Sequence, residues 1–381
     1  MIYLDAAATT LQKPPEVAQA AARTIRTCAS PGRGGYGAAQ KAAELAYETR
    51  ELAARLFTCE PEQVVFTMNA THALNLAIFS LVPPGGRAVT SGFEHNAVLR
   101  PLHALGAQIV PADRQLFDPD AALSGFFRAL ERKPDAVICN AVSNVFGCRM
   151  PIEAIADLCR DQDVPLILDL SQAAGCMDID QSSLRAAALA MPGHKGLYGP
   201  QGTGLLICGA PMTPLLYGGT GGASMLPTMP EELPERLEAG TQNVAGLGGL
   251  REGLRFVLEK TPQRIGAHEI ALRERVAEAL RGTPGLRCFV GEPGTQTGVL
   301  SLQFSDFSCE SVAEALGRRG VAVRAGLHCA PMAHESANTL PGGTLRISFS
   351  AFNTAREADA FVNLLQNLLE KPSEAGILLA R

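Results

Sequence analysis

The sequence predicts an α/β fold, with a mostly parallel central sheet sandwiched by helices and a smaller α+β domain beside it. Between about residues 40 and 260, short apolar runs alternate with longer amphipathic segments, and this alternation is typical of a mostly parallel sheet. After about Gly246 long helical patterns lead into a few short strands. A chain of 381 residues also exceeds what one hydrophobic core usually organises, which favours two domains.

The expected elements of the first domain follow from these runs. The helices are expected at Ala39–Phe57, Ala73–Leu81, Asn96–Leu105 and Ile152–Gln162. The strands are expected at Val64–Thr67, Ala88–Ser91, Ala107–Pro111, Ala136–Asn140, Leu166–Leu170, Ala187–Met191 and Gly204–Cys208. The run Pro165–Leu168 is apolar throughout, as a strand buried on both faces should be.

The second domain is expected to hold three helices and three strands. These are Leu247–Glu259, Ile265–Leu280 and Ala355–Leu369 for the helices, and Gly298–Phe304, Ala322–Arg324 and Thr344–Ser348 for the strands. We therefore divide the chain into a large domain of residues 16–246 and a small domain of residues 1–15 and 247–381.

Composition excludes several classes of protein. Charged residues make up 19% of the chain and the net charge is −5, with no long basic block, so no nucleic-acid partner is expected. None of the ten cysteines forms a CxxC pair, which argues against a structural metal site. No apolar run has the length of a membrane span and the opening has no signal-peptide pattern, so we expect a cytoplasmic protein with reduced thiols.

Two residues carry the first chemical signal. Asp169 ends an apolar strand, where an unpaired carboxylate is costly to bury and where open α/β sheets bind ligands. Lys195 lies in a turn bounded by Gly193 and Gly196, which lets the backbone approach a ligand closely. Taken alone, Asp169 is as readily a helix cap as a ligand-binding residue. A lysine such as Lys195, taken alone, is far more often a surface charge than a catalytic group. Together they suit pyridoxal phosphate (PLP), which needs a lysine for its aldehyde and a carboxylate at its pyridine nitrogen.

A set of motifs in a fixed order carries a resemblance across nearly the whole chain. They are Tyr3–Thr10, Phe66–Ile78, Glu94–Leu99, Val142–Gly147, Leu168–Ala173, Gly193–Pro200, Glu238–Thr241, Arg324–Pro331 and Arg346–Thr354. The sequence resembles class V aminotransferase-fold enzymes, specifically cysteine desulfurases. This resemblance implies PLP-dependent fold type I.

The resemblance also implies roles for residues around the cofactor ring. Lys195 would form a Schiff base with PLP and then act as the base at the substrate Cα. Asp169 would pair with the pyridinium nitrogen and Gln172 with the phenolic oxygen. His95 would stack on the ring and shuttle protons, although an isolated histidine is more often structural. Asn144 would lie near the phenolate and the substrate carboxylate.

The phosphate is expected at the start of a helix. Ala70 and Thr71 follow the strand Val64–Thr67, and helix N-termini offer free N–H groups to an anion. For Thr71 alone, an ordinary N-cap is an equal alternative. His194 would add a phosphate contact, and Thr241 would reach the phosphate of a neighbouring subunit, which implies a homodimer.

The reaction depends on three further residues. Arg346 would clamp the substrate carboxylate, a bidentate task suited to guanidinium, and a surface salt bridge is its alternative. Arg324 is the second expected substrate contact. Cys329 would be the nucleophile that takes sulfur from L-cysteine as a persulfide, leaving L-alanine, before transfer to a sulfur-acceptor protein. Positive neighbours, Arg324 and His328, would favour its thiolate.

The sequence departs from the family pattern at three places. Ala6 stands where asparagine is usual, Pro192 replaces a serine that would donate to the phosphate, and Asn69–His72 replaces Gly-Thr-Thr-Glu. The short segment after Cys329 resembles the SufS-like group of desulfurases.

Several other functions remain open at this point. One is selenocysteine lyase activity on L-selenocysteine. Another is an aminotransferase, epimerase or lyase in which Cys329 takes no part in catalysis. A third is a non-catalytic PLP-binding protein. A nucleotide-binding protein would use Gly32–Gly37 or Gly199–Gly204, although the first run follows no strand. A cysteine hydrolase would pair Cys329 with His328 or His334 but leaves Lys195 and Asp169 unexplained.

Overall fold

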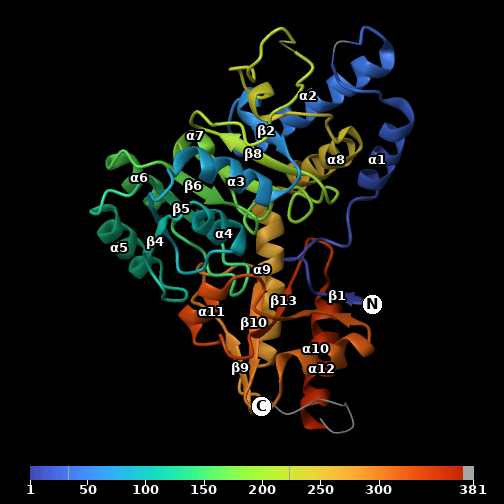
Figure 1. The fold of residues 1–381 in the computed structure, drawn as a ribbon. Helices are drawn as coiled ribbons and strands as arrows, with labels where there is room; N and C mark the ends of the chain where they lie inside the picture. The colour runs from blue at the N-terminus through green and yellow to red at the C-terminus, as the bar shows by residue number, and fades with distance from the viewer. Residues whose placement is uncertain (33, 223, 372–381) are drawn as a thin grey trace.

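The computed structural model describes residues 1–381 except 33, 223 and 372–381. Its larger part is built on a seven-stranded sheet in the order β2-β8-β7-β6-β5-β3-β4 (Figure 1). These strands are β2 (Val64–Thr67), β3 (Arg87–Thr90), β4 (Gln108–Pro111), β5 (Ala136–Asn140), β6 (Leu166–Asp169), β7 (Ala188–Pro192) and β8 (Gly204–Cys208). Only β8 runs antiparallel to its neighbours among these strands, so the prediction of a mostly parallel sheet is confirmed.

Helices cover both faces of this sheet. They are α1 (Pro15–Thr27), α2 (Gly37–Phe57), α3 (Ala70–Leu81), α4 (Asn96–Ala104), α5 (Pro119–Leu130), α6 (Ile152–Asp161), α7 (Gln181–Leu184) and α8 (Val244–Lys260), with 3-10 turns at Pro61–Gln63 and Glu235–Leu237. Side chains alternate along a strand, so neighbours such as Val137 and Ile138 enter two different hydrophobic clusters. This double coverage explains why the strands are apolar throughout.

The smaller part holds a four-stranded antiparallel sheet in the order β12-β13-β10-β9. Its strands are β9 (Leu286–Phe289), β10 (Val299–Phe304), β12 (Arg324–Gly326) and β13 (Thr344–Ser348), and its helices are α9 (Pro262–Ala279), α10 (Cys309–Arg318), α11 (Pro331–Ala337) and α12 (Ala355–Glu370). A separate pair joins β1 (Ile2–Tyr3) to β11 (Val321–Ala322) in parallel. The strand expected at Ala322–Arg324 is therefore two strands in different sheets.

The N-terminal residues link the two parts. Strand β1 lies in the smaller part whereas α1 lies against the larger one, and α9 runs from one to the other (Figure 1). Leu247, Leu250 and Leu254 of α8 belong to the core of the large sheet, whereas Leu272 and Val276 of α9 belong to the core of the smaller part. No described helix is long and apolar enough to cross a membrane.

Candidate active site

A cavity of about 110 Å³ opens where β5, β6 and β7 end. This is the edge at which parallel sheets bind ligands. Eight of the residues expected around a cofactor line it together: Ala70, Thr71, His95, Asn144, Asp169, Gln172, His194 and Lys195. The structure therefore brings together side chains that are far apart in the sequence.

Asp169 ends strand β6, and Lys195 lies in the turn that follows the neighbouring strand β7. Asp169 is the last residue of β6, and its Oδ1 accepts a hydrogen bond of 2.8 Å from the Ser171 N–H. Lys195 follows β7, and its removal from water lowers the pKa of its amine to about 8, against the opposing effect of the Asp169 carboxylate. A lysine with this pKa holds a usable fraction of neutral, nucleophilic amine near neutral pH.

His95 is a neutral imidazole with a defined tautomer. It caps α4, because its Nδ1 accepts a hydrogen bond of 3.0 Å from the Ala97 N–H, so its proton lies on Nε2. Removal from water is the largest effect on its pKa and lowers it below the usual value.

The start of α3 forms the other end of the cavity. Asn69, and not Thr71, is the N-cap, since its Oδ1 accepts a 2.9 Å hydrogen bond from the His72 N–H. Ala70 and Thr71 of the first turn are left facing the cavity. His194 Nδ1 lies 3.0 Å from Thr9 Oγ1. Burial lowers the pKa of His194 to about 4, so it presents a neutral ring.

Two amide side chains complete the wall. Gln172 Nε2 donates to the Ala7 carbonyl at 2.9 Å, and Asn144 Nδ2 donates to the His328 carbonyl at 2.8 Å. Asn144 Oδ1 is buried and has no hydrogen-bond partner, a condition that is costly unless a ligand supplies one. With an amine, a carboxylate and a free helix N-terminus around the same cavity, these residues fit pyridoxal phosphate.

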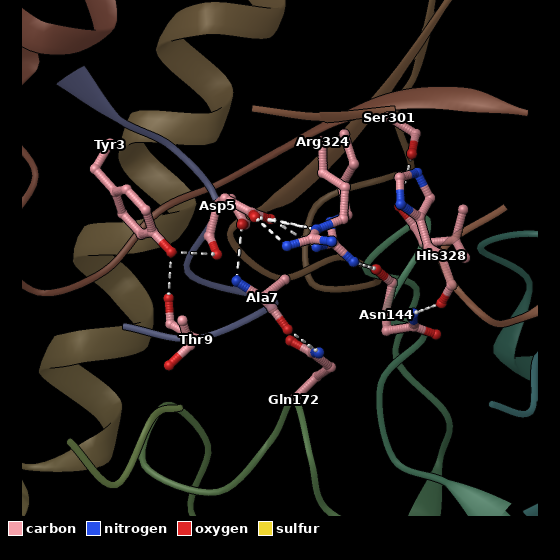
Figure 2. Close-up of polar contacts among 12 residues, drawn as sticks. Tyr3, Asp5, Ala7, Thr9, Asn144, Gln172, Ser301, Arg324 and His328 are labelled. Carbon is pink, nitrogen blue, oxygen red and sulfur yellow. Dashed lines mark hydrogen bonds and ion pairs between the residues drawn. The ribbon is translucent and has the colours of Figure 1, made fainter. Parts of the chain in front are cut away.

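Beside the cavity two arginines meet on one carboxylate (Figure 2). Arg346 Nη2 lies 2.8 Å from Asp5 Oδ1, and Arg324 Nη2 lies 2.8 Å from Asp5 Oδ2. Arg346 also donates through Nη1 to the Asn144 carbonyl at 2.9 Å. Arg346 is only 2% exposed, so the alternative of a surface salt bridge is wrong. The sequence analysis gave Asp5 no role, although it lies in the Tyr3–Thr10 motif.

Cys329 is exposed on a segment that is tied to this wall. Its carbonyl accepts a 2.7 Å hydrogen bond from the N–H of Asn96, the first residue of α4. His328 and Cys329 both have left-handed backbone angles, φ 49° and 57°, which are uncommon for residues other than glycine. The tie to α4 and the Asn144 bond to the His328 carbonyl hold this conformation in place.

The expectation of a positive His328 is wrong. Burial lowers the pKa of His328 to about 2, so its ring is neutral. Of the two residues expected to be positive beside Cys329, only Arg324 is charged. The rings of His328 and His334 are also bonded to Thr344 and Thr339, at 3.1 Å and 2.8 Å. Burial also lowers the pKa of His334 to about 4, so both rings are weak bases and the cysteine hydrolase alternative loses support.

Thr241 lies apart from the Lys195 cavity. It lines a groove of about 800 Å³ together with Arg50 and Glu238. Glu238 accepts hydrogen bonds of 2.6 Å from Arg50 Nη2 and from the Phe66 N–H, which fixes the segment that carries Thr241. Within one chain, therefore, Thr241 faces another surface.

The two glycine-rich runs of the nucleotide-binding alternative both lack the strand–turn–helix context of a dinucleotide motif. Residues 32–37, of which residue 33 lies outside the described part, come after helix α1 and not after a strand, and Gly199–Gly204 leads into strand β8 and not into a helix. Among the described residues no group of three or more His, Cys, Asp or Glu is placed to hold a metal ion.

A parallel sheet that presents a lysine of lowered pKa and a carboxylate on adjacent strand ends defines a PLP-dependent enzyme of fold type I. Comparison with known proteins narrows this class. The sequence profile of the class-V aminotransferases matches residues 2–361, and the chain belongs to that family.

Relatives that match nearly the whole chain are named as cysteine desulfurases. A probable cysteine desulfurase of Methanothermobacter thermautotrophicus is 29% identical over 393 residues, covering 98% of this chain and 95% of the relative. A probable cysteine desulfurase of Haemophilus influenzae is 32% identical, with 97% and 86% covered. The structure of a cysteine desulfurase from Thermococcus onnurineus superposes with a TM-score of 0.88 at 28% identity, covering 97% of this chain and 94% of that one.

Proposed function

We propose that this protein is a PLP-dependent cysteine desulfurase that converts L-cysteine to L-alanine and keeps the sulfur on Cys329 as a persulfide. The observation that carries the proposal is the anchoring of an exposed cysteine at the wall of the Lys195 cavity. Cys329 is tied through its carbonyl to Asn96, next to His95, and through His328 to Asn144. An aminotransferase or epimerase has no use for a thiol held there.

The first half of the reaction needs a held substrate and a base. Arg346 and Arg324 hold the substrate carboxylate, so that its Cα faces Lys195. Bound pyridoxal phosphate supplies an electron sink for the pair left at Cα, and Asp169 keeps the pyridine nitrogen protonated. Lys195, with its pKa of about 8, takes the Cα proton near neutral pH. The Nε2–H of His95 remains available to hand a proton to the substrate.

The second half moves sulfur. The Cys329 thiolate attacks the substrate sulfur, so an S–S bond forms while the Cβ–S bond breaks. The electron pair of the broken bond stays on the substrate carbon, which takes a proton and leaves as alanine. The exposure of Cys329 supports the next step, in which a thiol of a sulfur-acceptor protein, as in iron–sulfur cluster assembly, takes the outer sulfur.

A homodimer completes the proposal. Large apolar side chains are exposed on the segment that precedes Thr241, namely Leu216, Tyr217, Met225 and Leu226. Such a group of exposed apolar residues is typical of an interaction surface. A second copy seated in the Thr241 groove would bury them and bring Thr241 to the partner's phosphate. The ten free cysteines suit a reducing, cytoplasmic setting.

The purified protein tests this proposal. We expect visible absorbance that borohydride abolishes, and alanine formation from L-cysteine or L-selenocysteine without any added keto acid. Cys329→Ala should lose at least a hundredfold in alanine formation from L-cysteine while keeping its absorbance, whereas the control Cys28→Ala should match the parent. A colourless protein, or a Cys329→Ala variant as active as the parent, would contradict the proposal.

A further inference from the structure

The two arginines proposed to bind the substrate carboxylate already share a carboxylate of the chain itself. Asp5 accepts from Arg346 through Oδ1 and from Arg324 through both oxygens, at 2.8 to 3.3 Å (Figure 2). The side chains of Arg346 and Asp5 are only 3% and 10% exposed, whereas that of Arg324 is 51% exposed. Asp5 is therefore an inner member of the cluster and not a surface counter-ion.

This arrangement sets the charge of the site. Two guanidinium groups and one carboxylate leave a single net positive charge. Asp5 and Arg346 also act on the pKa of Lys195, so the cluster lies within electrostatic reach of the amine. Arg346 and Asp5 are largely removed from water, so the interaction between their charges is stronger than it would be in water.

Two buried polar atoms, on Arg346 and Asn144, have no hydrogen-bond partner and could bind a ligand. Arg346 uses Nη1 on the Asn144 carbonyl and Nη2 on Asp5. Its Nε is buried without a partner, as is Asn144 Oδ1. A buried guanidinium N–H that lacks an acceptor is costly, so it marks a place for an anionic group of a ligand.

Asp5 cannot easily turn away from this place. The Ala7 N–H donates to Ser348 Oγ at 2.8 Å, the Tyr3 carbonyl accepts from Asn353 at 2.9 Å, and the Tyr3 hydroxyl donates to the Thr9 carbonyl at 2.8 Å. These bonds fix the backbone on both sides of Asp5, and the contacts with Arg324 and Arg346 hold its side chain in the site.

We propose that Asp5 determines specificity, as a resident anion that offsets one arginine and leaves charge for a single substrate carboxylate. The inference rests on the proposed function and assigns its substrate class: α-amino acids that carry one carboxylate, such as L-cysteine. A dicarboxylic amino acid would bring a second negative charge toward Asp5 without a second free cation to receive it.

Binding of amino acids without sulfur to the holoenzyme tests this directly. L-Alanine and L-aspartate are titrated against the wild type, Asp5→Asn and Asp5→Glu, and each Kd is measured by the change in visible absorbance and by calorimetry. The ratio of the L-aspartate Kd to the L-alanine Kd should fall at least tenfold in Asp5→Asn. It should stay within threefold of the wild type in Asp5→Glu, which retains the charge. An unchanged ratio in Asp5→Asn would overturn the proposal.

A rescue experiment separates charge balance from direct contact. Arg324→Gln brings the net charge of the cluster to zero, and the Kd for L-alanine should rise at least fivefold. Adding Asp5→Asn to this variant restores one positive charge and should recover most of the affinity. If the double variant binds no better than Arg324→Gln alone, Asp5 does not act through charge. Both titrations use ligands without sulfur, so they remain valid even where the desulfurase reaction at Cys329 fails.

Discussion

The pKa of Lys195 governs how fast its amine captures an aldehyde. With a pKa of about 8, about a tenth of the amine is neutral at pH 7, compared with about one part in a few thousand for an ordinary lysine. We therefore expect the rate at which cofactor-free protein recombines with PLP to rise with pH and to level above about pH 8. Stopped-flow absorbance measures this rate, and one that still rises tenfold per unit above pH 9 would contradict the assignment.

Glu94 is a second residue whose charge state depends on its surroundings. It is fully buried, and Oε1 accepts from Ser91 Oγ at 2.6 Å and from the Asn140 N–H at 2.9 Å, while Oε2 has no partner. Burial raises the pKa of this carboxyl from 4.5 to about 8. Glu94 is therefore mostly protonated at neutral pH, in contact with Asn140 at the end of β5.

This raised pKa has a defined effect on stability. Because the folded protein holds the Glu94 proton more tightly than the unfolded chain, its contribution to stability is fully present below about pH 4.5 and is lost as the pH rises to about 8. Glu94→Gln should remove this loss, with a gain over the wild type that grows to a few kcal/mol by about pH 8. Urea unfolding at pH 5, 6.5 and 8 tests this, and a pH-independent difference would exclude the assignment.

The sequence supplied the identity of the site residues but not their partners. Lys195, Asp169 and the residues around them were recognisable because strand ends and motif order place them together. Asp5 and Glu94 could not be recognised from the sequence, because their importance lies in their contacts. Asp5 pairs with Arg324 and Arg346, and Glu94 accepts a hydrogen bond from Ser91. The neutral state of His328 was equally hidden, since it depends on burial.

Helix α8 supports the turn that carries Lys195. A Cβ on Gly253 would lie 2.2 Å from the Leu197 carbonyl oxygen, so only glycine lets the helix pack this closely. Gly253→Ala should lower the melting temperature by several degrees and weaken PLP retention. The control Gly317→Ala, also in a helix but with open space around its Cβ, should be neutral or slightly stabilising. Thermal unfolding that shows equal stability for the two variants would contradict this packing.

The sequence pattern predicted the fully buried strands better than several of the surface helices. Strands β2, β5 and β8 lie where expected because each is a run of apolar residues buried on both faces. Helices α1, α5 and α10 were not anticipated. The division of Val321–Gly326 between β11 and β12 was missed because the two short strands have different partners, β1 and β13, and nothing local in the sequence specifies these.

On the scale of the whole molecule, the N-terminal residues connect the small part to the Lys195 turn. Ala7 donates to Ser348 of β13 and accepts from Gln172, and the Thr10 N–H donates to the His194 carbonyl at 3.1 Å. A shift of either part is therefore transmitted to the site through these residues.

Removing one of these bonds tests the connection. Ser348→Ala leaves the buried Ala7 N–H unpaired, at a cost of about 1–3 kcal/mol. We expect a lower melting temperature together with a Kd for L-alanine that is at least threefold higher. The control Ser80→Ala removes a hydroxyl that donates to the Leu76 carbonyl of α3 and accepts from the Thr213 N–H, away from the site, and should leave that Kd unchanged. If both variants bind L-alanine equally, the N-terminal residues do not couple to the site.

The central claim is that sulfur passes to Cys329. The most direct test is to mix the holoenzyme with one equivalent of L-cysteine without any thiol acceptor and to measure the mass of the peptide that contains Cys329, together with free alanine. We predict one added sulfur atom on that peptide in step with the alanine released, and none on the peptide that contains Cys28. Alanine released with no sulfur on Cys329, or with sulfur spread evenly over both cysteines, would contradict the mechanism.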